Sequence, residues 1–223
     1  MNSPLVLSTK TLPNALRERI VQNGLAYMEY NAIRIQPIAF ETPVLSDYVI
    51  FSSQNATKAV LNKAHKLQDV QVLCVGKQSE KLLLEHQIKP LKTGKNMSEL
   101  VDFIQNSTKK GRFLHFCGNR RLPLLAKKMA EWNYDFNEVI VYKTGLAYKR
   151  IEGTPDGILF FSPSGVESHE KHNHVADAHC FCIGSTTASA FKQTPKSIHV
   201  VKNSNVEEVV AKAIHHLKIS HHA

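Results

Sequence analysis

Side chains that bear hydroxyl or amide groups gather in five short segments, each directly after a run of apolar residues. The segments are Ser52-Ser53-Gln54-Asn55, Gly76-Lys77-Gln78-Ser79, Cys117-Gly118-Asn119-Arg120, Ser162-Pro163-Ser164-Gly165 and Gly184-Ser185-Thr186-Thr187. Serine, threonine and asparagine at such positions commonly cap a following helix. They also offer O–H and N–H donors to a carboxylate or phosphate, beside the partial positive charge of a helix N-terminus. One junction would indicate only a capped helix, whereas five in one chain favour a ligand with several anionic groups.

These segments belong to an internal repeat. The stretch Ile50–Ala56 resembles Phe160–Val166, which lies 110 residues later. Three further pairs follow in the same order at nearly the same offset: Leu12-Pro13 with Leu122-Pro123, Cys74–Ser79 with Cys182–Thr187, and Asn96–Val101 with Asn205–Val210. The sequence therefore predicts a duplication, with two copies of one α/β unit.

Short apolar strands alternate with helices along the chain. Strands are expected at 5–7, 32–38, 48–51, 70–75, 113–117, 139–142, 157–161, 180–183 and 198–201, and helices at 12–23, 57–67, 79–86, 98–106, 122–132, 187–192 and 206–217. Continuous apolar strands between helices are typical of parallel sheets that are covered on both faces. The predicted fold class is α/β, with two doubly wound parallel-sheet domains.

Composition and charge narrow the classes of partner. The 223 residues are 43% hydrophobic and 21% charged, which is typical of a folded globular chain, and the formal net charge of +9 favours anionic partners. Lysine and arginine are scattered without interleaved aromatic residues, so nucleic acid is not expected as a partner. No apolar run approaches the length of a membrane span, and the start has no leader pattern. We expect no membrane partner and a cytoplasmic location.

Cysteine and histidine suggest neither disulfides nor a metal. The four cysteines lie in or beside predicted strands, where a thiol behaves as a small apolar group. The histidines of 169–174 fit no standard metal spacing, and this stretch is interpreted as a polar loop. His215-His216 and His221-His222 are interpreted as a solvated helix end and tail. Nucleotide-binding glycine motifs, a nucleophile turn and a zinc-protease motif are absent from the sequence. No metal and no cofactor are expected.

Tyr142 ends a predicted strand next to the stretch 149–155, which is interpreted as a connector between domains. A phenol in this place is either a half-buried core residue or a proton donor in a cleft. The residues themselves leave both alternatives open.

The chain resembles the uroporphyrinogen-III synthase family over nearly its whole length. The resemblance rests on Ile50–Ala56, Phe160–Val166, Cys182–Ala188, Val141–Thr144 and Phe116–Arg120. It implies two α/β domains joined by a two-stranded β-ladder. Residues 1–38 and 149–223 would form the first domain, and residues 39–148 the inserted second domain.

The resemblance also implies an activity. The family converts hydroxymethylbilane, a linear tetrapyrrole with eight carboxylates, into uroporphyrinogen III in haem biosynthesis. It removes water, inverts ring D and closes the macrocycle, without a cofactor or metal. Such an enzyme is a lyase, and we expect a monomer. Tyr142 matches the tyrosine proposed to assist the leaving hydroxyl, and Thr187 is the second expected catalytic residue.

The expected substrate-binding residues combine the five junctions with the end of the first strand. They are Lys10, Ser52, Ser53, Gln54, Asn55, Gly76, Ser79, Gly118, Asn119, Arg120, Ser162, Ser164, Gly165, Gly184, Ser185 and Thr186. Lys10 stands where many family members have arginine, so it keeps the charge but loses the bidentate geometry. Two rival functions stay open: a non-catalytic two-domain module that binds a polyanionic small molecule, and a basic protein that binds nucleic acid.

Overall fold

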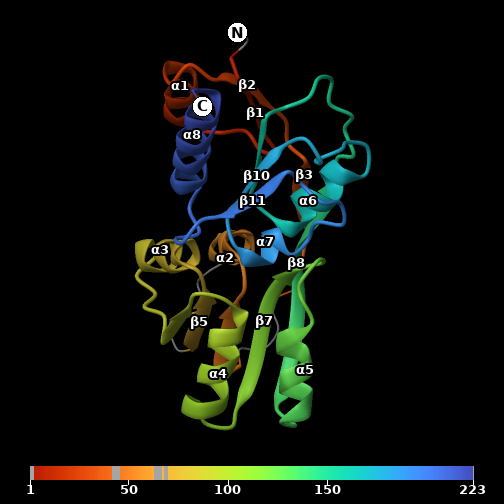
Figure 1. Ribbon diagram of the computed structural model, residues 1–223. Coiled ribbons are helices and arrows are strands. Elements are labelled where there is room, and N and C mark those ends of the chain that lie inside the picture. The colour runs from red at the N-terminus through yellow and green to blue at the C-terminus, as the bar shows by residue number, and fades with distance from the viewer. Residues whose placement is uncertain (1–2, 42–45, 63–66, 68–69, 223) are drawn as a thin grey trace. The chain divides into compact units, whose positions relative to one another are not determined.

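The chain divides into two compact units. In the computed structural model, which describes residues 3–41, 46–62, 67 and 70–222, unit 1 comprises Met1–Arg34 with Gly145–Ala223 and unit 2 comprises Ile35–Thr144 (Figure 1). Unit 2 is therefore inserted into the sequence of unit 1. Within the described residues, none of the helices is both long enough and apolar enough to cross a membrane.

Unit 1 contains a five-stranded sheet in which every adjacent pair is parallel. The order is β11-β10-β9-β1-β2, and the strands are β1 (Leu5–Ser8), β2 (Ala26–Glu29), β9 (Gly157–Phe160), β10 (His179–Cys182) and β11 (Ser197–Val200). Val6 to Ser8 of β1 pair with Gly157 to Leu159 of β9. A strand near the N-terminus and a strand that follows the inserted unit are thus neighbours in one sheet.

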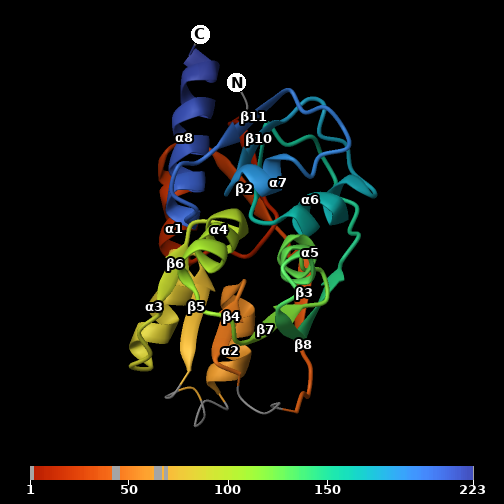
Figure 2. The same cartoon turned by 90° about the horizontal axis from the view of Figure 1, so that it is seen from below.

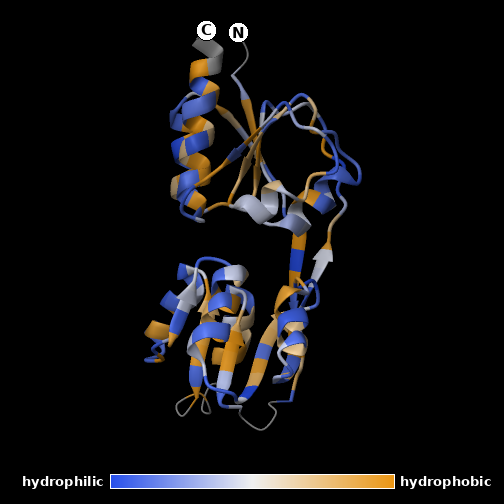
Figure 3. Ribbon diagram, turned by 60° about the horizontal axis from the view of Figure 1, so that its bottom comes forward, coloured by the Kyte–Doolittle hydropathy of each residue, from blue (hydrophilic) through white to orange (hydrophobic). Residues whose placement is uncertain are grey.

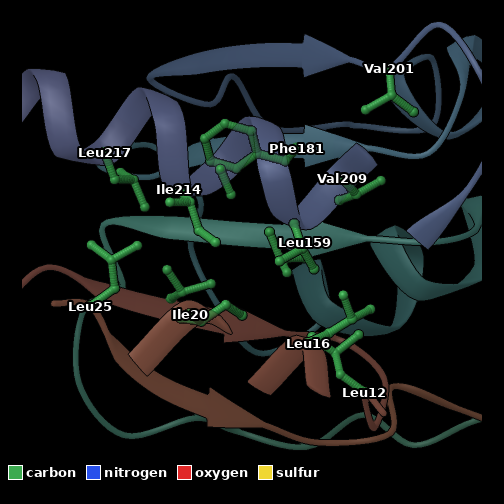
Figure 4. Close-up of a cluster of buried hydrophobic side chains, with 13 residues drawn as sticks. Leu12, Leu16, Ile20, Leu25, Leu159, Phe181, Val201, Val209, Ile214 and Leu217 are labelled. Atoms are coloured by element: carbon green, nitrogen blue, oxygen red, sulfur yellow. The ribbon is translucent and has the colours of Figure 1, made fainter. Parts of the chain in front are cut away.

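Helices cover both faces of this sheet. They are α1 (Asn14–Gln22), α6 (Pro163–Glu170), α7 (Ser185–Ala188) and α8 (Val206–His222). Ile20 of α1 and Ile214 of α8 pack with Leu159 of β9 on one face (Figure 4). On the other face, Val166 of α6 packs with the neighbouring strand residue Phe160. Successive residues of β9 are therefore buried on opposite faces, as a doubly wound sheet requires.

Unit 2 contains a six-stranded sheet in the order β3-β8-β7-β4-β5-β6. The strands are β3 (Ile33–Pro37), β4 (Tyr48–Phe51), β5 (Gln71–Val75), β6 (Lys92–Gly94), β7 (Arg112–Gly118) and β8 (Asp135–Leu146). Adjacent strands from β8 to β6 run parallel (Figure 2). The helices are α2 (Gln54–Leu61), α3 (Lys77–Glu85), α4 (Met97–Ser107) and α5 (Leu124–Glu131).

The core of unit 2 is also divided between two faces. Val60 of α2 packs on the face that holds Phe51, whereas Leu100 of α4 and Met129 of α5 pack on the face that holds Ile50. Figure 3 shows the hydrophobic strands and the mixed hydropathy of the helices within each unit. The predicted α/β class with doubly wound parallel sheets is confirmed.

The strands β3 and β8 carry the chain between the units. The Ile38 N–H donates to the Val141 carbonyl at 3.1 Å, and the Ala147 N–H donates to the Ala32 carbonyl at 2.9 Å. Along these two bonds the residue number falls on the β3 side while it rises on the β8 side, so the strands are antiparallel. They form the two-stranded ladder that the family resemblance implied.

Several elements differ from the sequence prediction. The strands β2 and β6 and the helix α6 were not predicted; β2 is half-buried and β6 has three residues, so neither gives a clear apolar run. The predicted loop at 169–174 is wrong at its start, because His169 lies in α6 and is buried. The predicted helix at 187–192 is wrong in extent, since α7 ends at Ala188. The predicted end of the helix at 57–67 falls partly outside the described residues.

Candidate active site

Parallel strands bring the predicted segments to one edge of the sheet in each unit. In unit 2, β4 ends at Phe51 and β5 at Val75, each directly before a predicted segment, and β7 ends at Gly118, within the segment that begins at Cys117. In unit 1, β9 ends at Phe160 and β10 at Cys182, each separated by one residue from one of the other two segments. Carboxyl ends of parallel strands meet at one edge, where ligands of open α/β sheets bind. Each unit therefore has its own candidate edge.

Two of the predicted serines cap helices at these edges. Ser53 is the N-cap of α2, and its Oγ accepts a hydrogen bond from the Ala56 N–H at 3.2 Å. Ser162 is the N-cap of α6 and accepts from the Gly165 N–H at 3.0 Å. The repeat thus reproduces the same cap in both units, and helix capping accounts for part of the hydroxyl pattern.

The N-cap residues of α3 and α7 are glycines without a side-chain cap. Gly76 precedes α3 with φ of 83°, a left-handed conformation that favours glycine, and Gly184 precedes α7. Ser79 and Thr187 occupy the third position of these helices and are buried, at 1% and 3% exposure. The two halves of the repeat therefore place a buried hydroxyl at equivalent positions.

The predicted residues differ in exposure. Gln54, Asn119, Arg120, Ser185 and Thr186 are exposed; Lys10, Ser52, Ser53, Asn55, Gly76, Tyr142, Ser162, Ser164 and Gly184 are half-buried; Ser79, Gly118, Gly165 and Thr187 are buried. Lys10, Ser162, Ser164, Gly165, Gly184, Ser185, Thr186 and Thr187 belong to unit 1, and the others to unit 2.

Tyr142 is the best-positioned reactive side chain of unit 2. Its phenol oxygen lies 3.0 Å from Ser53 Oγ and also hydrogen-bonds to Asn55. Burial raises the pKa of Tyr142 more than these two hydrogen bonds lower it. The phenol is therefore protonated at neutral pH and can donate a proton or a hydrogen bond.

The segment after β7 positions Tyr142. A register shift between Cys117 and Gly118 pairs Gly118 with Tyr142, and a Cβ on Gly118 would lie 2.4 Å from the tyrosine Cζ. The ring therefore rests against a backbone that lacks a side chain. Asn119 donates its N–H to the Tyr142 carbonyl at 3.2 Å, and its Oδ1 accepts from the Thr144 N–H at 2.8 Å. Gly118 and Asn119 hold β8 and the phenol in place.

A chain of polar groups centred on the buried His115 reaches the same edge and was missed by the sequence analysis. His115 of β7 is 1% exposed; its Nε2 lies 2.8 Å from Ser52 Oγ and its Nδ1 lies 3.0 Å from Glu138 Oε1. Arg121 Nε donates to Glu138 Oε2 at 2.7 Å. We call these groups the Ser52–His115–Glu138 chain.

The electrostatics of this chain fix the orientation of the imidazole. The hydrogen bond from His115, followed by that from Arg121, lowers the pKa of Glu138 to about 2. An ionised carboxylate only accepts hydrogen bonds, so His115 Nδ1 carries a proton. In the neutral ring, Nε2 then accepts from the Ser52 hydroxyl. A single histidine within the apolar run 113–117 was the one available signal, because a buried imidazole needs polar partners.

The candidate edge of unit 1 is built around Lys10. Its Nζ lies 5.0 Å from the centre of the Phe161 ring, and the Ser8 hydroxyl donates to the Lys10 carbonyl. Thr9 Oγ1 donates to the Leu159 carbonyl at 2.7 Å, which joins the end of β1 to β9. The structure thus brings a cation next to the segment that follows β9.

The two parallel sheets and their hydroxyl-bearing carboxyl edges define a two-domain α/β protein of the kind that binds small ligands at strand ends. The family described as uroporphyrinogen-III synthase HemD matches residues 14–217, so this chain belongs to that family. A comparison with curated protein sequences gives no match.

Solved structures agree in fold. The uroporphyrinogen-III synthetase from Helicobacter pylori is 17% identical, with 96% of this chain and 99% of that chain covered and a TM-score of 0.68. A mutant uroporphyrinogen III synthase from the extremely thermophilic bacterium Thermus thermophilus is 14% identical, with 98% and 100% covered and a TM-score of 0.70. At these identities, the likeness supports the shared fold.

Proposed function

We propose that this chain cyclises hydroxymethylbilane to uroporphyrinogen III, with loss of water and inversion of ring D, and that it does so as a hydro-lyase. The family match over residues 14–217 carries this proposal. The resemblance implies a reaction without a cofactor. We further propose that the protein acts as a cytoplasmic monomer, with no nucleic-acid or membrane partner.

Substrate binding would use the donors at the carboxyl edges. Hydroxymethylbilane carries eight carboxylates, and the first turns of α2, α3 and α6 offer backbone N–H groups and a partial positive charge. Each exposed contact of a carboxylate with a helix N-terminus contributes about 0.3–1 kcal/mol. The formal net charge of +9 adds long-range attraction. Several weak contacts together would hold the flexible chain in one folded conformation.

The leaving-group step assigns a role to Tyr142. The C–O bond of the hydroxymethyl group breaks with its electron pair on oxygen, and a proton from the phenol would complete the water molecule. The resulting azafulvene cation is attacked by the substituted carbon of ring D, which gives a spiro intermediate that fragments and recloses. Because water and other donors can also supply a proton, Tyr142 assists this step without being indispensable.

The Ser52–His115–Glu138 chain supports a positioning role. With a neutral imidazole, the Ser52 hydroxyl donates to His115, and its oxygen remains an acceptor. A pyrrole N–H of the substrate is a matching donor. The carboxylate of Glu138, paired with Arg121, holds the imidazole in this orientation. His115 would thus orient Ser52 rather than react itself.

The decisive experiment distinguishes the isomers of the product. Freshly generated hydroxymethylbilane closes spontaneously to uroporphyrinogen I, so the products formed with and without the protein are oxidised and separated by chromatography. Predominantly type III product supports the synthase. If only type I product formed, at the spontaneous rate and in the presence of folded protein, the enzymatic proposal would be refuted and the polyanion-binding module favoured. Binding to arbitrary DNA that weakens with salt would instead favour the nucleic-acid alternative.

A further inference from the structure

Three histidines of unit 1 gather beside β10 and β11, the two strands at one side of its sheet. His179 is the first residue of β10, His199 lies in β11, and His216 lies in the C-terminal half of α8. β10 and β11 are parallel, with His179 paired to Ser197 at their amino ends. The expectation that His216 lies on a solvated helix end is wrong, because its side chain is half-buried against the other two rings.

The ring nitrogens of these histidines converge. Ser197 Oγ lies 2.7 Å from His179 Nδ1 and 2.7 Å from His199 Nε2, while His216 Nε2 lies 3.1 Å from His179 Nδ1. One nitrogen from each ring lies within 4.8 Å of the other two. In a tetrahedral zinc site, with Zn–N bonds of about 2.0–2.1 Å, ligand nitrogens are about 3.3 Å apart. Small ring rotations would therefore bring all three to bonding distance.

Charged and titratable groups from several elements surround these imidazoles. Burial lowers the pKa of all three, and repulsion from a neighbouring histidine lowers it further in each. Lys196 acts in the same direction on His179 and His216, and Lys212 on His199, whereas Asp156 raises the pKa of His179.

A second cluster, of His115, Cys117 and Glu138, is less suited to a metal. Its carboxylate is already bound by Arg121 and by the imidazole, and burial raises the pKa of the Cys117 thiol to about 12. A metal there would have to displace an internal ion pair and remove a tightly held proton. The histidine cluster of unit 1 requires neither change.

We propose that His179, His199 and His216 bind one divalent transition-metal ion of the zinc class, with Ser197 or water as the fourth ligand. Three imidazoles are a ligand set that zinc accepts, whereas magnesium prefers oxygen. The site would tie α8 to β10 and β11. Because none of the three histidines is a residue of the candidate edge, its role would be structural and not catalytic.

Calorimetric titration of the full chain with Zn²⁺ tests the proposal. We expect one saturable site for Zn²⁺ and none for Mg²⁺. His199→Gln and His216→Gln should each weaken Zn²⁺ binding at least about tenfold, since even changes around metal ligands cost roughly 10–100-fold. The matched control is His174→Gln, at an exposed histidine of the same unit, which should retain the affinity. Absence of one-to-one binding, full affinity in either single variant, or loss of binding in the control would overturn the proposal.

Cobalt gives a readout that does not depend on the variants folding. Co²⁺ bound by three imidazoles in a four-coordinate site should produce intense visible absorption in the wild-type protein, and Zn²⁺ should displace it. Wild-type protein without this absorption would also refute the site. The isomer assay, run with chelator and with Zn²⁺, should give the same proportion of type III product, so this test is separate from that of the proposed activity.

Discussion

The substitution Gly118→Ala probes how Tyr142 is positioned. The added Cβ would lie 2.4 Å from Cζ, 2.6 Å from Cε2 and 2.7 Å from the phenol oxygen of Tyr142. Carbon atoms in favourable contact are about 3.5–4.0 Å apart, so the ring or the backbone must retreat by about 1 Å. A shift of that size would break the 3.0 Å contact between the phenol and Ser53.

Two measurements should respond. Overpacking of this kind typically costs about 1–3 kcal/mol of unfolding free energy. Trp132, the one tryptophan of the chain, packs in the core of unit 2, so its fluorescence during urea unfolding reports on this unit. A displacement of about 1 Å can cost roughly 10²-fold in rate. We therefore expect the initial rate of type III formation to fall by a factor of about 10 to 100.

Two controls make the test specific. Gly145→Ala adds the same methyl group near the end of β8, where the nearest atom would be the Arg34 carbonyl oxygen at 3.9 Å, and should leave stability and rate nearly unchanged. In a Tyr142→Ala background, Gly118→Ala should have little further effect, because the ring that it would strike is absent. If Gly118→Ala retained wild-type stability and rate, the packing argument would be refuted.

Other substitutions test separate parts of the site. Tyr142→Phe should slow type III formation about tenfold without abolishing it, and an unchanged rate would exclude the leaving-group role. Thr187→Val should lower the same rate while Thr187→Ser retains it, with thermal unfolding as the check on folding; equal rates would remove the hydroxyl from the mechanism. Glu138 has a folded-state pKa below its ordinary value, so its stabilisation is present above about pH 4.5 and is lost as pH falls toward 2. Glu138→Gln should therefore reduce stability by about 2–3 kcal/mol at pH 7, allowing for solvent screening, and by much less near pH 3. Urea unfolding across this pH range would contradict the argument if the difference stayed constant.

Most of the fold could be predicted from local signals. The run Tyr48–Phe51 is continuously apolar because β4 is buried on both faces, and the helix after it begins where Ser53 can cap it. The strand β9 and the cap at Ser162 show the same features, although the helix that follows, α6, was not predicted. Such strands and caps are encoded by adjacent residues, so one sequence suffices to find them.

Polar contacts across strands and helices could not be predicted in the same way. His115 and Glu138 are 23 residues apart, and their contact depends on the register of β7 with β8. The buried His169 hydrogen-bonds to Tyr30 at 2.8 Å across 139 residues. A polar stretch was therefore interpreted as a loop, because nothing near it in the sequence shows the partner that offsets the cost of its burial.

The position of β1 has a consequence for synthesis on the ribosome. This strand lies between β2 and β9, yet β9 follows only after all of Ile35–Thr144 has been translated. Until then, the apolar residues Leu5 to Leu7 have no neighbouring strand on one side, and such an unpaired edge promotes association with other chains. The inserted unit can fold first, because it is one continuous segment that is translated completely before β9. Nascent chains that stop after Thr144 should therefore be targets for chaperones, because β1 is then exposed and β9 has not yet been made.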